Sequence, residues 1–195
     1  MLVSTTTHIR IPEENYVEDM AGIMKLWEKG CYAVTGAIDE KAPGKLVFPD
    51  TELYMAAQSM ADLILLESDG AKCLPCKVPR KGEPIIVMDC KLVIGVMGMS
   101  ALGREMGECC FRFDSDGKWL GVSSDHLLDE EVAVKILSSE MGTRKSVDDR
   151  RYIVVLNQCD NEEILARAER ISSTLASEHR IESVCCSLQS GQHMG

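Results

Sequence analysis

The segment from residue 61 to residue 84 most constrains this chain, because an apolar run there ends in carboxylates and leads into a proline-rich basic loop. The apolar residues 63–66 are typical of a strand buried on both faces of an α/β sheet, although a short buried helix segment would look the same. Glu67 and Asp69 follow at once, and Gly70 comes next. Ligands of open α/β sheets bind outside the carboxyl ends of the strands, where two such carboxylates suit a hydrated Mg²⁺. A simple Asp-Gly turn is the alternative, and the spacing favours neither.

The remaining pattern predicts a single α/β domain over residues 1–195, with a mostly parallel sheet and flanking helices. A strand at 152–156, a helix at 161–177 and a strand at 181–186 form a βαβ unit, which requires parallel pairing. Other expected elements are a helix from residue 12 to Gly30, a hairpin over 32–48, a helix from Asp50 or Thr51 to residue 61, strands at 85–88 and 91–96, and a helix from Ser124 or Asp125 to Gly142. We expect the strands at 63–66 and 152–156 to be interior strands of one sheet.

The net charge of -10 argues against a nucleic-acid or anionic-membrane partner. Basic residues do cluster twice, and each cluster could bind a small anionic ligand or simply be solvated. The first cluster lies in the central loop and the second precedes the strand at 152: Lys72, Lys77, Arg80 and Lys81; Arg144, Lys145, Arg150 and Arg151.

Nine cysteines, an odd number, follow no secretory signal, and no apolar run reaches the ~20 residues of a membrane span. We therefore expect reduced thiols, a cytoplasmic location and no membrane partner. Cys73 and Cys76 form a CxxC motif, but structural zinc requires about four ligands and no second pair with suitable spacing follows. No zinc is expected.

Two further motifs resemble parts of nucleotide-binding sites. Gly98 and Gly103 have the glycine interval of a P-loop, but Glu105 stands where Ser or Thr would bind Mg²⁺, so a strand end and a short loop are the better interpretation. Asn157 and Asp160, in Asn-Gln-Cys-Asp after a predicted strand, have the spacing of the guanine-reading motif N-K-x-D. Helix capping by Asp160 or Asn161 is the alternative there.

Several of these motifs together carry a resemblance to a known family. They are the opening L-V-S-T-T-T-H over residues 2–8, E-S-D-G-A-K over 67–72, L-P-x-K-V-P over 74–79, E-P at 83–84, and N-Q-C-D over 157–160. In order and spacing they resemble the YqeC-type accessory proteins of selenium-dependent molybdenum hydroxylases over nearly the whole chain. The specific part is E-x-D-G followed by L-P-x-K-x-P and E-P.

The resemblance implies a P-loop NTPase-like fold, a bound ATP or GTP with Mg²⁺, and a cytoplasmic role in maturing a molybdenum hydroxylase. It implies that Thr5, Thr6 and Thr7 lie near the phosphates. Glu67 and Asp69 would lie near Mg²⁺, Lys72 and Lys77 would supply positive charge, and Asn157 and Asp160 would face the base.

One departure from the family limits what this chain is expected to do. The family has a strand and a glycine-rich G-K-T loop ahead of the threonines, whereas Met1 stands inside the first predicted element. We therefore expect an N-terminally truncated domain with an incomplete nucleotide site, inactive as a hydrolase as given, and prone to self-association through the uncovered surface. The alternatives are a non-catalytic module that binds an anionic small molecule or the partner hydroxylase, and a thiol-based carrier of metal or selenium through Cys73 and Cys76.

Overall fold

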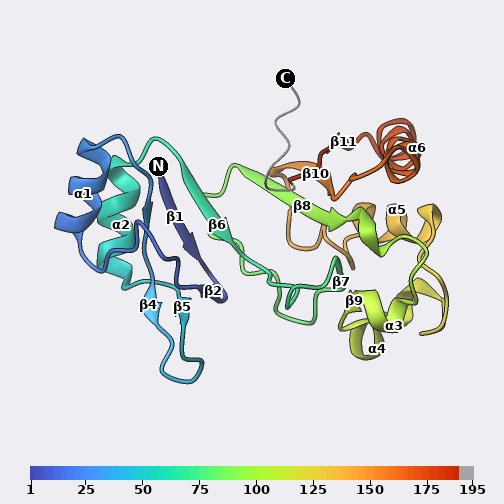
Figure 1. Cartoon of the computed structure of the whole chain (residues 1–195), viewed down its shortest axis with the longest axis horizontal. Coiled ribbons are helices and arrows are strands. Elements are labelled where there is room, and N and C mark those ends of the chain that lie inside the picture. Colours follow the sequence, from blue (N-terminus) through green and yellow to red (C-terminus); the bar gives the residue numbers. More distant parts are fainter. Residues whose placement is uncertain (189–195) are drawn as a thin grey trace. The chain divides into compact units, whose positions relative to one another are not determined.

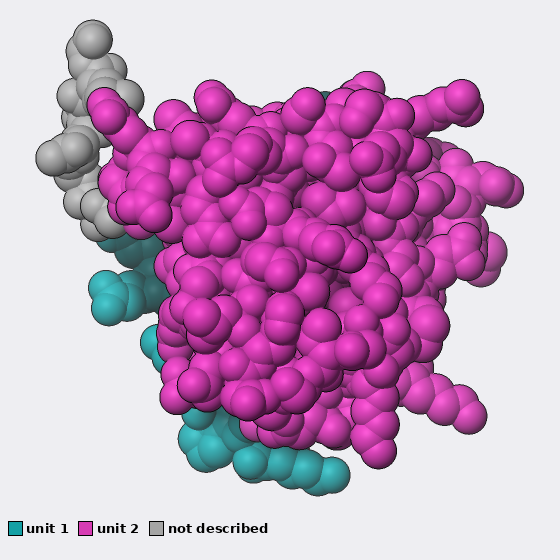
Figure 2. Space-filling model, turned by 90° about the vertical axis from the view of Figure 1, so that its right-hand side faces the viewer, with its two compact units in different colours: residues 1–70 teal, residues 71–195 magenta. Residues whose placement is uncertain are grey.

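A computed structural model of the chain describes residues 1–188. They fall into two compact units, residues 1–70 and the described residues from 71 onward, which are coloured separately in Figure 2. Each unit has its own buried cluster and its own sheets, and each is described by itself. Two compact units can belong to one folding domain, so the division neither supports nor contradicts the predicted single domain over residues 1–195.

Unit 1 is built on a three-stranded parallel sheet with two helices packed against each other (Figure 1). The strands are β1 (Leu2–Thr5), β3 (Ala33–Val34) and β6 (Ile64–Glu67), and the helices are α1 (Met20–Glu28) and α2 (Thr51–Met60). A small antiparallel sheet adds β2 (Ile9–Arg10), β4 (Ala37–Ile38) and β5 (Lys45–Val47). The core cluster contains Leu2, Ile23, Ala33, Tyr54 and Ala57, so the sheet and both helices share one buried layer.

Unit 2 contains the predicted βαβ unit. Strand β10 (Arg151–Asn157) pairs in parallel with β11 (Glu182–Cys185) after helix α6 (Glu162–His179), and on its other side with β8 (Leu92–Gly98). Helix α5 (Glu130–Ser138) packs on α6. One core joins Val154 and Leu156 of β10 to Ile136 of α5 and Ile171 of α6.

The rest of unit 2 consists of short elements around a two-stranded parallel sheet. In this sheet β7 (Cys76–Lys77) pairs with β9 (Cys110–Phe111). The others are η1 (Met99–Ala101), α3 (Met106–Cys109), α4 (Phe113–Asp116) and η2 (Lys118–Leu120).

The predicted α/β class with parallel strands is confirmed, whereas the arrangement of the strands is not. The described strands form several small sheets, and β6 is an edge strand of its sheet rather than an interior one. Of the two strands expected to be interior strands of one sheet, only β10 has strand neighbours on both sides, and β6 and β10 lie in different sheets. The burial of β6 reflects its edge position, because its residues alternate between half-buried and exposed, as in a strand covered on one face. The likeness to P-loop NTPases stays a prediction.

Helix boundaries differ from the sequence expectation where another cap is stronger. Helix α1 begins at Met20 and not near residue 12, because the Asp19 carboxylate accepts the Gly22 N–H at 2.7 Å. Helix α5 likewise begins after Asp129, which caps Val132, and not after Ser124 or Asp125. Residues 85–88 form no strand, since a turn closes from Cys90 N–H to the Val87 carbonyl.

Over residues 1–188, no helix combines the length and the apolar character that crossing a membrane requires.

Candidate functional site

In unit 1 the threonine run meets the acidic strand end. Strands β1 and β6 pair in register, with Thr5 opposite Glu67 at their carboxyl ends. The Thr5 hydroxyl donates to the Glu67 carbonyl at 2.9 Å, and the Thr6 N–H donates to the same oxygen at 2.9 Å. The Thr7 N–H then donates to the Thr5 hydroxyl at 2.9 Å. These bonds fix the backbone of residues 5–7 against the end of β6.

Gly70 marks where the side chains of this edge converge. A Cβ atom at residue 70 would lie 3.1 Å from Glu67 Oε1 and 3.8 Å from the Thr7 hydroxyl. A larger residue would therefore enter the space beside the Glu67 carboxylate. This close approach is a physical reason for glycine in the E-x-D-G segment.

The donor set at this edge suits a hard cation such as Mg²⁺. Glu67 is exposed, Asp69 is half-buried, and both offer carboxylate oxygens, which Mg²⁺ prefers together with water. No group of three His, Cys, Asp or Glu side chains in the described part of the chain could hold a metal. A cation here would therefore be bound by at most two carboxylates and would keep several waters, in the manner typical of Mg²⁺ at phosphate sites.

In unit 2 the Asn-Gln-Cys-Asp segment follows β10, with Asn157 paired opposite Gly98 at the end of β8. Gln158, at φ 63°, accepts a hydrogen bond from the Ser100 hydroxyl at 2.6 Å. A Cβ atom at residue 98 would lie 2.3 Å from Gln158 Oε1. Gly98 thus leaves room for Gln158. The P-loop-like segment begins with a strand end, as predicted, but a short 3-10 helix follows where a loop was expected.

Asp160 and Asn161 have different contacts. Asn161 caps α6, since its side chain accepts the Ile164 N–H at 2.9 Å. Asp160 accepts the Ser187 hydroxyl at 2.5 Å. Asp160 is therefore not the helix cap, and its role in base reading stays a prediction. Asn157 is held by the Gln158 N–H, which donates to its side-chain oxygen at 2.7 Å.

The basic loop brings Lys72 and Lys77 to one aromatic ring. Their Nζ atoms lie 5.1 Å and 5.4 Å from the centroid of Phe111. Lys77 is only 8% exposed and forms an ion pair with Glu83 at 3.0 Å. The sequence singled out both lysines but not Phe111 or Arg112, because the pairing of β7 with β9 joins two distant segments through only two residues each.

The two cysteines of the CxxC motif lie in different environments. Cys73 is exposed, whereas Cys76 is buried beside Cys110, its register partner. Hydrogen bonding to Cys110 and burial raise the pKa of Cys76 well above its usual value. Desolvation by burial also raises the pKa of Cys109 to about 11. A protonated, buried Cys76 thiol is a poor nucleophile and a poor metal ligand.

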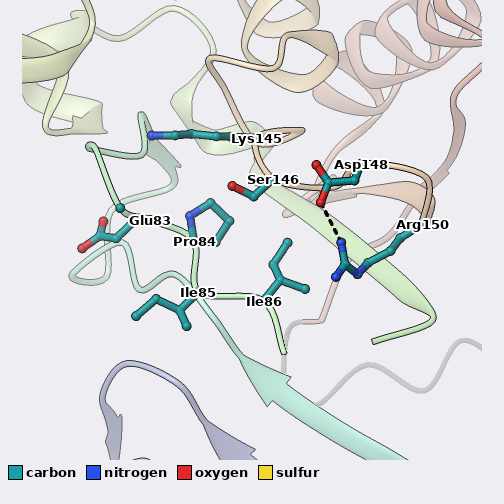
Figure 3. Close-up of a pocket in the computed structure, with 9 residues that line it drawn as sticks. Glu83, Pro84, Ile85, Ile86, Lys145, Ser146, Asp148 and Arg150 are labelled. Atoms are coloured by element: carbon teal, nitrogen blue, oxygen red, sulfur yellow. Dashed lines mark hydrogen bonds and ion pairs between the residues drawn. The ribbon is translucent and has the colours of Figure 1, made fainter. Parts of the chain in front are cut away.

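The second basic cluster borders a shallow cavity of about 370 Å³, lined by residues 82–86 and by the loop before β10 (Figure 3). Most of its charges have protein partners. Arg150 pairs with Asp148 at 3.0 Å, Arg151 pairs with Glu182 at 2.7 Å, and Lys145 Nζ donates to the Arg80 carbonyl at 2.6 Å. These contacts favour a structural role for this cluster over anion binding.

Known proteins match this chain over the segments that contain these motifs. The family model described as YqeC protein matches residues 1–114, which include the threonine run, the E-x-D-G segment and the basic loop. A protein of Escherichia coli (strain K12), named uncharacterized protein YqeC, is 26% identical over 197 residues, which cover 94% of this chain and 75% of the relative. No solved structure matches. With more than half of its residues matched by the family model, the chain belongs to the YqeC family.

Proposed function

We propose that this protein is an accessory factor in the maturation of a selenium-dependent molybdenum hydroxylase and that it binds ATP or GTP with Mg²⁺. The proposed metal residues are Glu67 and Asp69 in unit 1, where Thr5, Thr6 and Thr7 are the residues proposed to lie near the phosphates. The proposed base residues are Asn157 and Asp160 in unit 2, where Lys72 and Lys77 supply positive charge. Separate variants test the metal residues, the base residues and the lysines.

The pairing of Thr5 with Glu67 at the carboxyl end of a parallel sheet carries this proposal. Ligands of α/β sheets bind at such ends, and hydroxyl and carboxylate oxygens together suit a hydrated Mg²⁺ next to a phosphate. When bound, Mg²⁺ would neutralise phosphate charge, while the Thr7 hydroxyl, which the hydrogen bonds within residues 5–7 hold beside Gly70, would orient the anion. Membership of the YqeC family supports the accessory role through the resemblance noted above.

The metal-binding part is tested by calorimetric titration of ATP and GTP into the wild type and Asp69→Asn. We expect Asp69→Asn to weaken both nucleotides when Mg²⁺ is present and neither when it is chelated, because the proposed partner of Asp69 is the water shell of the metal. Asp62→Asn, an exposed site just before β6, is the charge-matched control. Equal losses with and without Mg²⁺, or an equal loss in the control, would refute the metal role.

The partner is tested by producing a selenium-dependent molybdenum hydroxylase with and without this protein. The proposal predicts a higher hydroxylase activity and selenium content per enzyme when the wild type is present, and no such gain with Glu67→Ala. Purified hydroxylase with identical activity and selenium content in all three preparations would contradict the accessory role.

One alternative has an observation in its favour. The lysines over Phe111 support a non-catalytic module that binds an anionic small molecule. A thiol carrier through Cys73 and Cys76 is disfavoured, because Cys76 is buried against Cys110.

A further inference from the structure

Phe111 in β9 is surrounded by cationic side chains from three segments of unit 2. Lys72 Nζ lies 5.1 Å, Lys77 Nζ 5.4 Å and Arg112 Cζ 4.9 Å from the ring centroid. Each distance is within the range of a cation–π contact. One ring thus gathers three positive charges, which repel one another.

The backbone holds these side chains in place through conformations that non-glycine residues rarely adopt. Lys72 and Cys73 have φ values of 50° and 65°, in a turn closed by the Leu74 N–H and the Ala71 carbonyl at 3.0 Å. Arg112 has φ 64° at the start of α4. Left-handed residues of this kind are concentrated at ligand sites, where the surrounding fold maintains the strain.

The cations around the ring differ in their carboxylate partners. Glu83 is the carboxylate that pairs with Lys77 at 3.0 Å, with Arg80 at 2.9 Å and with Arg112. The Glu83 carboxylate is thus shared by three cations. Lys72 is exposed and makes no ion pair with any residue that the structure describes. The second basic cluster differs, since both Arg150 and Arg151 have a carboxylate of their own.

We propose that Lys72, Arg112 and Lys77 form a binding site for a phosphoryl group above Phe111. A phosphate would bring a negative charge to the exposed Lys72, which makes no ion pair with the described residues, and the planar guanidinium of Arg112 matches two phosphate oxygens at once. The mostly buried Lys77 would contribute charge from inside the fold, and the exposed Lys72 would contribute charge from the solvent side. The inference adds Phe111 and Arg112 to the proposed function and does not depend on any recognition of a nucleotide base.

Calorimetric titration of the full chain with inorganic pyrophosphate at low salt tests this site. We expect saturable one-to-one binding in the wild type and an affinity about tenfold weaker in Lys72→Gln and in Arg112→Gln, since each removes one close charge. Lys81→Gln is the matched control, because Lys81 is an exposed lysine of the same loop with no contact to Phe111. Arg112→Lys retains the charge but loses the planar fork, so its affinity should fall between those of the wild type and Arg112→Gln.

Circular dichroism melts identify any variant that has lost its fold, and Lys72→Gln, at an exposed side chain, keeps the test decisive if Arg112 variants do not fold. Absence of saturable binding, or an equal loss in Lys72→Gln and Lys81→Gln, would overturn the site, since only diffuse surface charge would then act. Displacement of pyrophosphate by GTP would assign the site to nucleotide phosphates, and its absence to another phosphorylated small molecule. Unchanged pyrophosphate affinity in Asp160→Asn separates this result from the proposed base reading.

Discussion

Asn161 and Asp160 are adjacent, yet they have different hydrogen-bond partners and different proposed roles. Asn161 accepts the Ile164 N–H and starts α6, whereas Asp160 accepts the Ser187 hydroxyl. Removal of an N-cap side chain typically costs ~1 kcal/mol. We therefore expect Asn161→Ala to lower the free energy of unfolding by about 1 kcal/mol. Asp160→Asn should leave it almost unchanged. Urea unfolding of both variants compares the two, and a larger loss in Asp160→Asn would reverse the assignment.

The cysteines of the basic loop provide a second prediction for single residues. Burial beside Cys110 keeps the Cys76 thiol protonated, while Cys73 is exposed. Since the thiolate is the reactive form, iodoacetamide near pH 8 should alkylate Cys73 and leave Cys76 unmodified in the folded protein. Peptide mass spectrometry gives the extent of modification at each site. Equal labelling of both cysteines before unfolding would restore the thiol-carrier hypothesis.

Ion pairs of Glu130 add to the apolar contact between α5 and α6 in unit 2. Arg167 donates to the Glu130 carboxylate through Nε at 2.9 Å and NH2 at 3.1 Å, and Arg170 donates at 2.9 Å. Hydrogen bonds from Arg167, and then from Arg170, hold the pKa of Glu130 near 2, against an ordinary value of 4.5. A depressed folded-state pKa stabilises the fold above pH 4.5, and this contribution is lost as the pH falls toward 2.

Glu130→Gln should therefore destabilise the protein near neutral pH and have little effect near pH 2. The Glu130 side chain is 30% exposed, and solvent screening reduces the effect to about 1 kcal/mol. Denaturant unfolding of the wild type and the variant from pH 7 down to pH 2 measures the difference. A difference that stays constant over this range would contradict the ion-pair explanation.

Elements with clear sequence signals were predicted well, and those defined by distant pairing were not. The order β10, α6, β11 follows from a continuous apolar run, an amphipathic repeat and a second run, and it is confirmed. The start of α1 was wrong because Pro12 and the acids after it resemble a helix start, while the cap is Asp19. No strand pattern predicted the pairing of Thr5 with Glu67, and only the family resemblance had implied that both residues lie near one nucleotide site. Phe111 was missed, because no local pattern reports the pairing of β7 with β9.

For the molecule as a whole, an uncovered apolar surface has the clearest consequence for its behaviour in solution. Strand β8 is an edge strand of unit 2, and Ile94 and Val96 lie on one face in register with Ile153 and Val155 of β10. Val96 is 56% exposed, whereas Val154 and Leu156, on the other face, are buried in the core. Large exposed apolar patches and open strand edges promote association between molecules.

We expect concentration-dependent self-association through this face, which Val96→Lys should reduce by placing a charge on the edge strand. Leu127→Lys is the control, since Leu127 is 54% exposed but lies outside this sheet. Sedimentation velocity over a range of concentrations measures the effect. A wild type that stays monomeric, or an equal response in both variants, would exclude this face as the interface.

The most direct test of the central claim is calorimetric titration of GTP and ATP, with Mg²⁺, into the wild type and Asp160→Asn. We predict that Asp160→Asn weakens the binding of GTP by ~1–3 kcal/mol, because the guanine donors lose a charged acceptor. The binding of ATP should stay almost unchanged. Capping does not complicate the comparison, since Asn161 caps α6. Equal GTP affinity of the wild type and Asp160→Asn would contradict the proposed reading of the base.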